Sequence, residues 1–133
     1  MNIFNLPKYQ WWDYMQPIMQ NVNLDKISFV QNNQMTFTFL NSCNGKYYRT
    51  LSCSQILKCC IENDAFEDEP FAYFVLDVYK RALNREELES ALVYYKYGYP
   101  INSSILDQQY NLLVMIGSEI CIDFVCGVIR SSE

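Results

Sequence analysis

Alternating hydrophobic and polar positions predict antiparallel strands in the first half of the chain. In "MTFTFL" (35–40) the hydrophobic residues occupy every second position with threonines between them, which is the period of a half-buried strand. A similar run, "KISFVQ" (26–31), precedes it across "NNQ", a short polar connection suited to a hairpin. "NSCNG" then leads to "KYYRTL" (46–51). Three consecutive antiparallel strands are the simplest interpretation.

One segment carries the signals of a helix, about residues 85–97. In "NREELESALVYYKYG", Asn84 is a suitable N-cap, and Glu86 and Glu87 lie in the first turn. Leu88, Leu92 and Tyr95 recur on one side, and Gly98 is expected to end the helix. A weaker helix is predicted over 8–16, between Pro7 and Pro17.

Two further runs fit either kind of element. Residues 55–62 match helix and strand equally, whereas 71–81 are rich in Phe, Tyr and Val, which favours a strand over 71–79. The last third predicts two strands around a turn at Gly117–Ser118. The sum is an α+β fold: a mostly antiparallel sheet, the helix at about 85–97, and one or two weaker helices, in a single globular domain, residues 1–133.

Composition narrows the class of protein. Half of the residues are hydrophobic and 19% are charged, which excludes a disordered chain. No run reaches the roughly 20 apolar residues of a membrane-spanning helix, and the N-terminus lacks the pattern of a secretory signal. A cytoplasmic protein is expected. The six cysteines agree with this, because four lie in apolar runs and are expected to be reduced core residues (Cys59, Cys60, Cys121 and Cys126).

Missing residues and motifs argue against an enzyme. The chain has no histidine, which removes Ser–His–Asp and Cys–His catalysis, and it has neither a Gly-rich phosphate loop nor a Cys-x-x-Cys motif. Acid–base work by Glu67, Asp68 and Glu69, or calcium binding by "ENDAFEDE", stays open as a minor alternative. We expect no catalytic residue, no cofactor and no metal.

The acidic residues are concentrated in one region. Residues 62–89 hold nine acidic side chains against three basic ones, whereas the rest of the chain is nearly balanced. Such a patch disfavours direct binding of nucleic acid or of an anionic membrane, and favours association with a positively charged protein. A solvated acidic loop without function is the competing interpretation of "ENDAFEDEP" (62–70).

Tyrosines form the second unusual feature. "YYKYGYP" (94–100) follows the predicted helix, and one or two of its tyrosines are expected to be exposed, where tyrosine favours protein binding. The alternative is that they cap the edge of the core. The predicted partner-binding residues combine both features: Glu62, Asp64, Glu67, Asp68, Glu69, Glu86, Glu87, Glu89, Tyr97 and Tyr99.

In overall character the chain resembles the bacterial toxin-immunity proteins, including those of contact-dependent growth inhibition systems. The likeness rests on "ENDAFEDEP", "NREELES" and "YYKYGYP", and no residue is carried over from it. It implies a non-enzymatic inhibitor that occludes the active site of a basic toxin, for example a nuclease. Two alternatives remain: a phage-type inhibitor of a bacterial defence protein, and a self-associating accessory domain.

Overall fold

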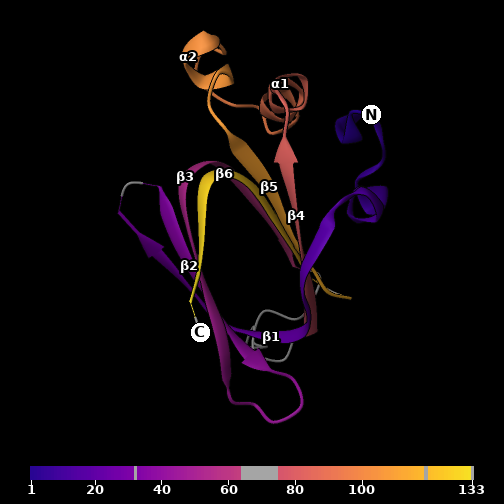
Figure 1. Ribbon diagram of the computed structural model, residues 1–133, viewed down its shortest axis with the longest axis vertical. Helices are drawn as coiled ribbons and strands as arrows, with labels where there is room; N and C mark the ends of the chain where they lie inside the picture. Colours follow the sequence, from indigo (N-terminus) through magenta and orange to yellow (C-terminus); the bar gives the residue numbers. More distant parts are fainter. Residues whose placement is uncertain (32, 64–74, 119, 133) are drawn as a thin grey trace.

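The computed structural model describes residues 1–31, 33–63, 75–118 and 120–132, and six antiparallel strands dominate it (Figure 1). They close into a barrel in the order β1-β2-β3-β6-β5-β4. The strands are β1 (Gln16–Val30), β2 (Gln34–Asn41), β3 (Tyr47–Asn63), β4 (Val75–Leu83), β5 (Tyr110–Ile116) and β6 (Ile120–Ser132). The helical elements are short: two 3-10 turns, η1 (Ile3–Asn5) and η2 (Lys8–Tyr14), and two α-helices, α1 (Arg85–Tyr94) and α2 (Ser103–Leu106). The predicted α+β class with a mostly antiparallel sheet is confirmed.

The inside of the barrel is a packed core. Side chains at alternate strand positions point inward, and the rings of Phe37 and Phe124 stack there with centroids 5.5 Å apart. Leu24, Phe39 and Leu113 are fully buried beside them. Side chains fill this interior, so the functional groups must be sought outside the barrel.

A second core covers the outer face of β5 and β6. Leu112, Val114 and Val125 point away from the barrel interior, yet they are buried against Trp11 of η2 and Leu88 of α1, among others. Figure 1 shows α1, α2 and the N-terminal turns gathered near one end of the barrel. The helical elements therefore bury a face of the sheet that would otherwise meet water.

The hairpin and the meander are confirmed, but β1 begins much earlier than predicted. β1 pairs with β2 and β2 with β3, all antiparallel. Residues 16–25, predicted in part as helix and otherwise unassigned, are strand as well. Register shifts interrupt β1, and Asn21 has a φ of 54°, so its hydrophobic positions do not alternate. Pro17 is tolerated because this part of β1 pairs with β4 alone.

The ambiguous segments are strands. The strand predicted over 46–51 begins at Tyr47 and forms one long strand, β3, with residues 55–62; its register against β6 shifts between Ile56 and Lys58. Gly127 of β6 lies against Gln55, whose Oε1 would be 2.2 Å from any Cβ added at the glycine. The predicted strand over 71–79 is confirmed for its described part, since β4 starts at Val75; residues 71–74 lie outside the described residues.

Helix α1 begins as predicted and ends early. The Asn84 side chain accepts from the Glu87 amide, and the Glu87 side chain accepts from the Asn84 amide, which is a complete capping box. The helix ends at Tyr94, not at Gly98, because Lys96 already takes a left-handed φ of 55°. In 8–16 the helical part is the 3-10 turn η2. No helix in the described ranges is long and apolar enough to cross a membrane.

The six cysteines are free thiols with different environments. Cys53, Cys121 and Cys126 are buried, as expected of core cysteines. Cys59, however, is exposed and Cys60 only partly buried. The expectation of burial was therefore wrong for Cys59.

Candidate functional site

The most unusual polar group in the described structure is Asp123, in the middle of β6. Its neighbours Ile122 and Phe124 point into the barrel, so the alternation of the strand sends Asp123 to the outer face. That face is covered by η2 and α1, and the Asp123 side chain is 0% exposed. A buried carboxylate needs partners that satisfy its charge.

Two other segments supply those partners. Lys8 of η2 places its Nζ 2.6 Å from Asp123 Oδ1, and the Tyr95 hydroxyl at the end of α1 donates to Asp123 Oδ2. Burial by itself lowers the pKa of Lys8, but the hydrogen bond and charge of Asp123, with a further bond to Glu62, raise it above its ordinary value. Burial and the Asp123 charge also raise the pKa of Tyr95. Lys8 is thus held as an ammonium and Tyr95 as a neutral phenol, and together they fasten η2 and α1 to the barrel.

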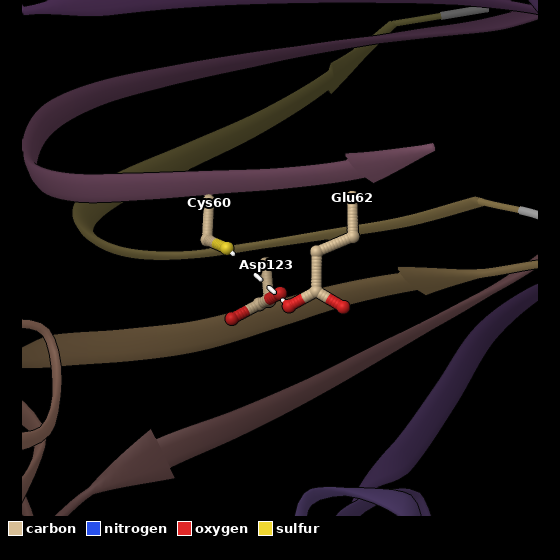
Figure 2. A group of neighbouring side chains, drawn as sticks. All are labelled: Cys60, Glu62 and Asp123. Carbon is tan, nitrogen blue, oxygen red and sulfur yellow. Dashed lines mark hydrogen bonds between the residues drawn. The ribbon is translucent and has the colours of Figure 1, made fainter. Parts of the chain in front are cut away.

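Neighbouring side chains on β3 extend this cluster toward solvent (Figure 2). Cys60 lies directly opposite Asp123 in the β3–β6 ladder, and Glu62 lies opposite Cys121. Glu62 Oε1 accepts from Lys8 Nζ at 3.0 Å and from the Cys60 thiol at 3.6 Å. Its hydrogen bond with Lys8 lowers the pKa of Glu62, although the side chain is 59% exposed. We call Lys8, Asp123, Tyr95, Cys60, Glu62 and Cys121 the Asp123 cluster.

The cysteines in this cluster are poor nucleophiles. Burial, followed by the Asp123 charge, raises the pKa of the Cys121 thiol to about 12, and the same two causes raise the pKa of Cys60. A catalytic cysteine needs a lowered pKa, so the environment acts in the wrong direction. The arrangement favours a structural or binding role for both thiols.

Three members of the cluster are of the types that ligate metals. Atoms of Cys60, Glu62 and Asp123 lie within 4.8 Å of one another, and thiolate with carboxylate ligands would suit Zn²⁺. The Lys8 ammonium, however, lies within 3.0 Å of both carboxylates. Lys8 therefore already supplies the positive charge that these carboxylates require, and a metal would have to displace it.

A separate groove lies between η1 and α1. Its volume is about 510 Å³, and it is lined by Phe4, Asn5, Glu86, Glu89, Ser90, Val93 and Tyr94. Glu86 and Glu89 are exposed, and neither forms an ion pair within the residues that the structure describes. Val93 and Tyr94 are exposed apolar groups beside them. We call this feature the η1–α1 groove.

Aromatic packing links the groove to the Asp123 cluster. The Tyr94 ring lies 5.9 Å from Phe4, 5.1 Å from Trp11 and 5.0 Å from Tyr95, measured between ring centroids. The pKa of Tyr94 is raised mainly by burial, with contributions from the charges of Asp123 and Glu62. The two features are therefore neighbours, separated by this aromatic layer.

The structure separates the predicted partner-binding residues into three groups. Glu86 and Glu89 come together in the η1–α1 groove, and Glu62 lies at the exposed rim of the Asp123 cluster. Tyr99 is 71% exposed and Tyr97 is half-buried, with their rings 5.5 Å apart. Asp64, Glu67, Asp68 and Glu69 lie outside the described residues.

Glu87 requires a correction. It was predicted to contact a partner, but it is 2% exposed, completes the capping box of α1, and pairs with Arg81 at 2.9 Å. Arg81 also donates to the carbonyl oxygens of Tyr14 and Met1, so this pair ties the N-terminal segment to α1. Glu87 is a structural residue and is not available to a partner.

Sequence reasoning missed the Asp123 cluster. A single acidic residue within the apolar run "ICIDFVCGV" was a usable signal, because an isolated charge in a buried strand requires a partner. Lys8, the only basic residue among the aromatic residues at the N-terminus, was the matching signal. Their contact joins residues far apart in the chain and could be found only from the fold.

The architecture defines an α+β protein built on a closed antiparallel barrel, with its polar cluster outside the barrel. Residues 17–133 match the sequence model of one protein family. Since the match spans most of the chain, the protein belongs to this family, which is uncharacterised.

A solved structure shares the fold. It is the crystal structure of an uncharacterized protein from Neisseria gonorrhoeae, with a TM-score of 0.57 and 20% sequence identity, over 90% of this chain and 97% of that chain. At this identity the similarity shows the fold and nothing about activity. No curated protein matches the chain.

Proposed function

We propose that this protein is a non-enzymatic inhibitor that acts in the cytoplasm and binds a basic protein partner in the η1–α1 groove. The observation that supports this most is the pair Glu86 and Glu89, two exposed carboxylates without an ion pair among the described residues, set beside an apolar wall. Four other described carboxylates are engaged: Glu62 and Asp123 with Lys8, Glu87 with Arg81, and Asp107 with Arg85. Asp13 and Asp25 are exposed without an ion pair among the described residues, but neither lines the groove. The groove thus offers unpaired negative charge to a partner.

The chemistry of the groove suits a segment that carries lysine or arginine next to apolar residues. Val93 and Tyr94 would contact the apolar part, and tyrosine is favoured at protein interfaces because it adds contact area at little entropic cost. The carboxylates would attract and orient the basic part, which acts mainly on the rate of association. An immunity protein that blocks a basic toxin is the specific form that we propose.

The supporting experiment is affinity capture with matched variants. The full chain, the double variant Glu86→Gln/Glu89→Gln, and the double variant Asp13→Asn/Asp25→Asn are immobilised and exposed at low salt to an extract of the organism that carries the gene. The second double variant removes the same charge from exposed positions outside the groove. We expect a basic protein to be retained by the wild type and by the control, and to be lost from the groove variant.

Two results would contradict the proposal. One is a captured partner that is acidic or neutral; the other is a basic partner that the groove variant retains as well as the wild type does. Both double variants change only exposed side chains and are expected to fold as the wild type does. Unchanged fluorescence of the buried Trp11 checks this.

A further inference from the structure

A second cavity lies beside the Asp123 cluster, between η2 and the strands. It has a volume of about 310 Å³ and is lined by Lys8, Tyr9, Trp12, Glu62, Ile116 and Cys121. That volume is at the lower end of the range of ligand pockets, roughly 300–1,000 Å³, and suits a single side chain or a fragment. We call it the η2 pocket.

The walls of the η2 pocket are mainly apolar and aromatic. Tyr9 and Trp12 are three residues apart in a 3-10 turn, a spacing that places both side chains on the same side. Ile116 of β5 and Cys121 of β6 contribute apolar surface from the barrel. Two aromatic rings on one side of a small cavity are well suited to a cation, because the ring face carries negative charge density.

The charge at the pocket favours a cation as well. Lys8 contributes one positive charge, while Asp123 and Glu62 contribute two negative charges within 3.0 Å of its Nζ. The group therefore carries a net charge of −1, which disfavours an anion. Glu62 receives both of its hydrogen bonds at Oε1, and Oε2 makes none within the described residues. Among the residues that the structure describes, no donor therefore occupies Oε2 at the rim of the pocket.

We propose that the η2 pocket binds an alkyl cation, the side chain of an arginine or a lysine, with its methylene groups against Tyr9 and Trp12 and its charged end at Glu62. Lys8 is neutralised by the buried Asp123, so its ammonium does not repel this ligand across the pocket. The proposal is independent of the η1–α1 groove, because no residue lines both cavities. It gives Glu62 a role in binding the charged end of the ligand, in addition to its ion pair with Lys8.

The test is an NMR titration with capped amino acids as probes. N-acetyl arginine methylamide and N-acetyl lysine methylamide are compared with the neutral analogues of citrulline and norleucine. The indole N–H signal of Trp12 reports on the pocket, and that of Trp11 serves as an internal control, since it is buried and donates to the Leu6 carbonyl. We expect saturable shifts of Trp12 with the two cations, and binding of both neutral analogues weaker by about threefold or more.

Variants test the two parts of the pocket separately. Glu62→Gln removes the charge and Trp12→Leu removes one ring, and each is expected to weaken cation binding by about threefold. Because Trp12→Leu lacks the indole signal, binding to the wild type and to every variant is also followed by the backbone amide signals of Tyr9 and Cys121, which line the pocket. Asp25→Asn, an equal loss of charge at an exposed position on β1, is expected to change nothing. Stronger binding of arginine than of lysine would identify a guanidinium site, and the reverse an ammonium site.

Equal binding of the neutral and cationic probes would overturn the proposal, as would unchanged cation binding after both Glu62→Gln and Trp12→Leu. Loss of cation binding in Asp25→Asn would also overturn it, because the effect would then come from overall charge. None of these results bears on Glu86 and Glu89, so failure here is distinguishable from failure of the proposed function.

Discussion

Asp123 connects three segments through a single buried carboxylate, and its partner Lys8 contacts two carboxylates that differ in exposure. Lys8 bridges Asp123, which is fully buried, and Glu62, which is mostly exposed. Removing one partner of a buried pair is costly because the other charge loses its compensation, whereas an exposed pair contributes little. The two ion pairs of Lys8 therefore allow the stabilising effect of a buried carboxylate to be compared with that of an exposed one.

Asp123→Asn is expected to lower the free energy of unfolding by about 3 kcal/mol, because it leaves the Lys8 ammonium partly buried with only Glu62. Glu62→Gln is expected to lower it by less than about 1 kcal/mol. Urea unfolding followed by tryptophan fluorescence measures both. Equal losses in the two variants would show that Lys8 does not depend on the buried partner.

The buried thiol of Cys121 makes stability depend on alkaline pH. Its pKa is raised from an ordinary value of 9.0 to about 12, so above pH 9 the unfolded chain loses a proton that the folded chain keeps. The unfolded state then binds fewer protons, and stability falls as pH rises. Between about pH 9 and pH 11 the wild type should lose about 1.4 kcal/mol per pH unit more than Cys121→Ala. Urea unfolding across this range measures the two slopes; parallel slopes would contradict the assignment.

At the scale of elements, the predictable parts of the fold were those with a local cause. The cap of α1 is encoded by Asn84 and Glu87, two positions three residues apart that form a capping box, and the structure contains it. β2 alternates cleanly because its neighbours β1 and β3 pair with it without a shift over Phe37. The first half of β1 was missed because bulges and Pro17 conceal its period, and only pairing with β4 makes it a strand.

Asn84→Ala tests directly whether the capping box stabilises α1. The change removes the acceptor for the Glu87 amide, and the loss of an N-cap is expected to reduce the free energy of unfolding by about 1 kcal/mol. Asn102→Ala at the start of the four-residue helix α2 is the comparison, with a smaller expected loss because that helix is short and exposed. Urea unfolding again provides the measurement; a loss at Asn102 as large as that at Asn84 would contradict the role given to the capping box.

For the whole molecule, the closed barrel explains why the polar groups lie where they do. Side chains fill the interior of the closed barrel and leave no room there for other elements. η2 and α1 therefore pack on the outside, where they form the second core with β5 and β6. Closure depends on pairing between β1 and β4, which are far apart in sequence, and no local pattern predicts it. Local patterns cannot predict the candidate sites either, because the η1–α1 groove and the η2 pocket each join residues from separate segments.

The sequence predicted Glu62, Glu86 and Glu89 as partner-binding residues because they lie in the acidic region 62–89, and all three are exposed. It could not separate them from Glu87, which has the same residue type and lies in the same helix. The difference is Arg81, whose side chain reaches Glu87 from β4. A charge pattern identifies acidic segments, while the fold decides which of their members remain unpaired.

The most direct test of the proposed function is the association rate of the captured basic partner, measured with purified proteins as salt increases. For the wild type and Asp13→Asn/Asp25→Asn, we expect the rate to fall by about tenfold or more from low to high salt. For Glu86→Gln/Glu89→Gln we expect a slower rate at low salt and a clearly weaker dependence on salt. An association rate that is indifferent to salt, or equal in the groove variant and the wild type, would contradict the account.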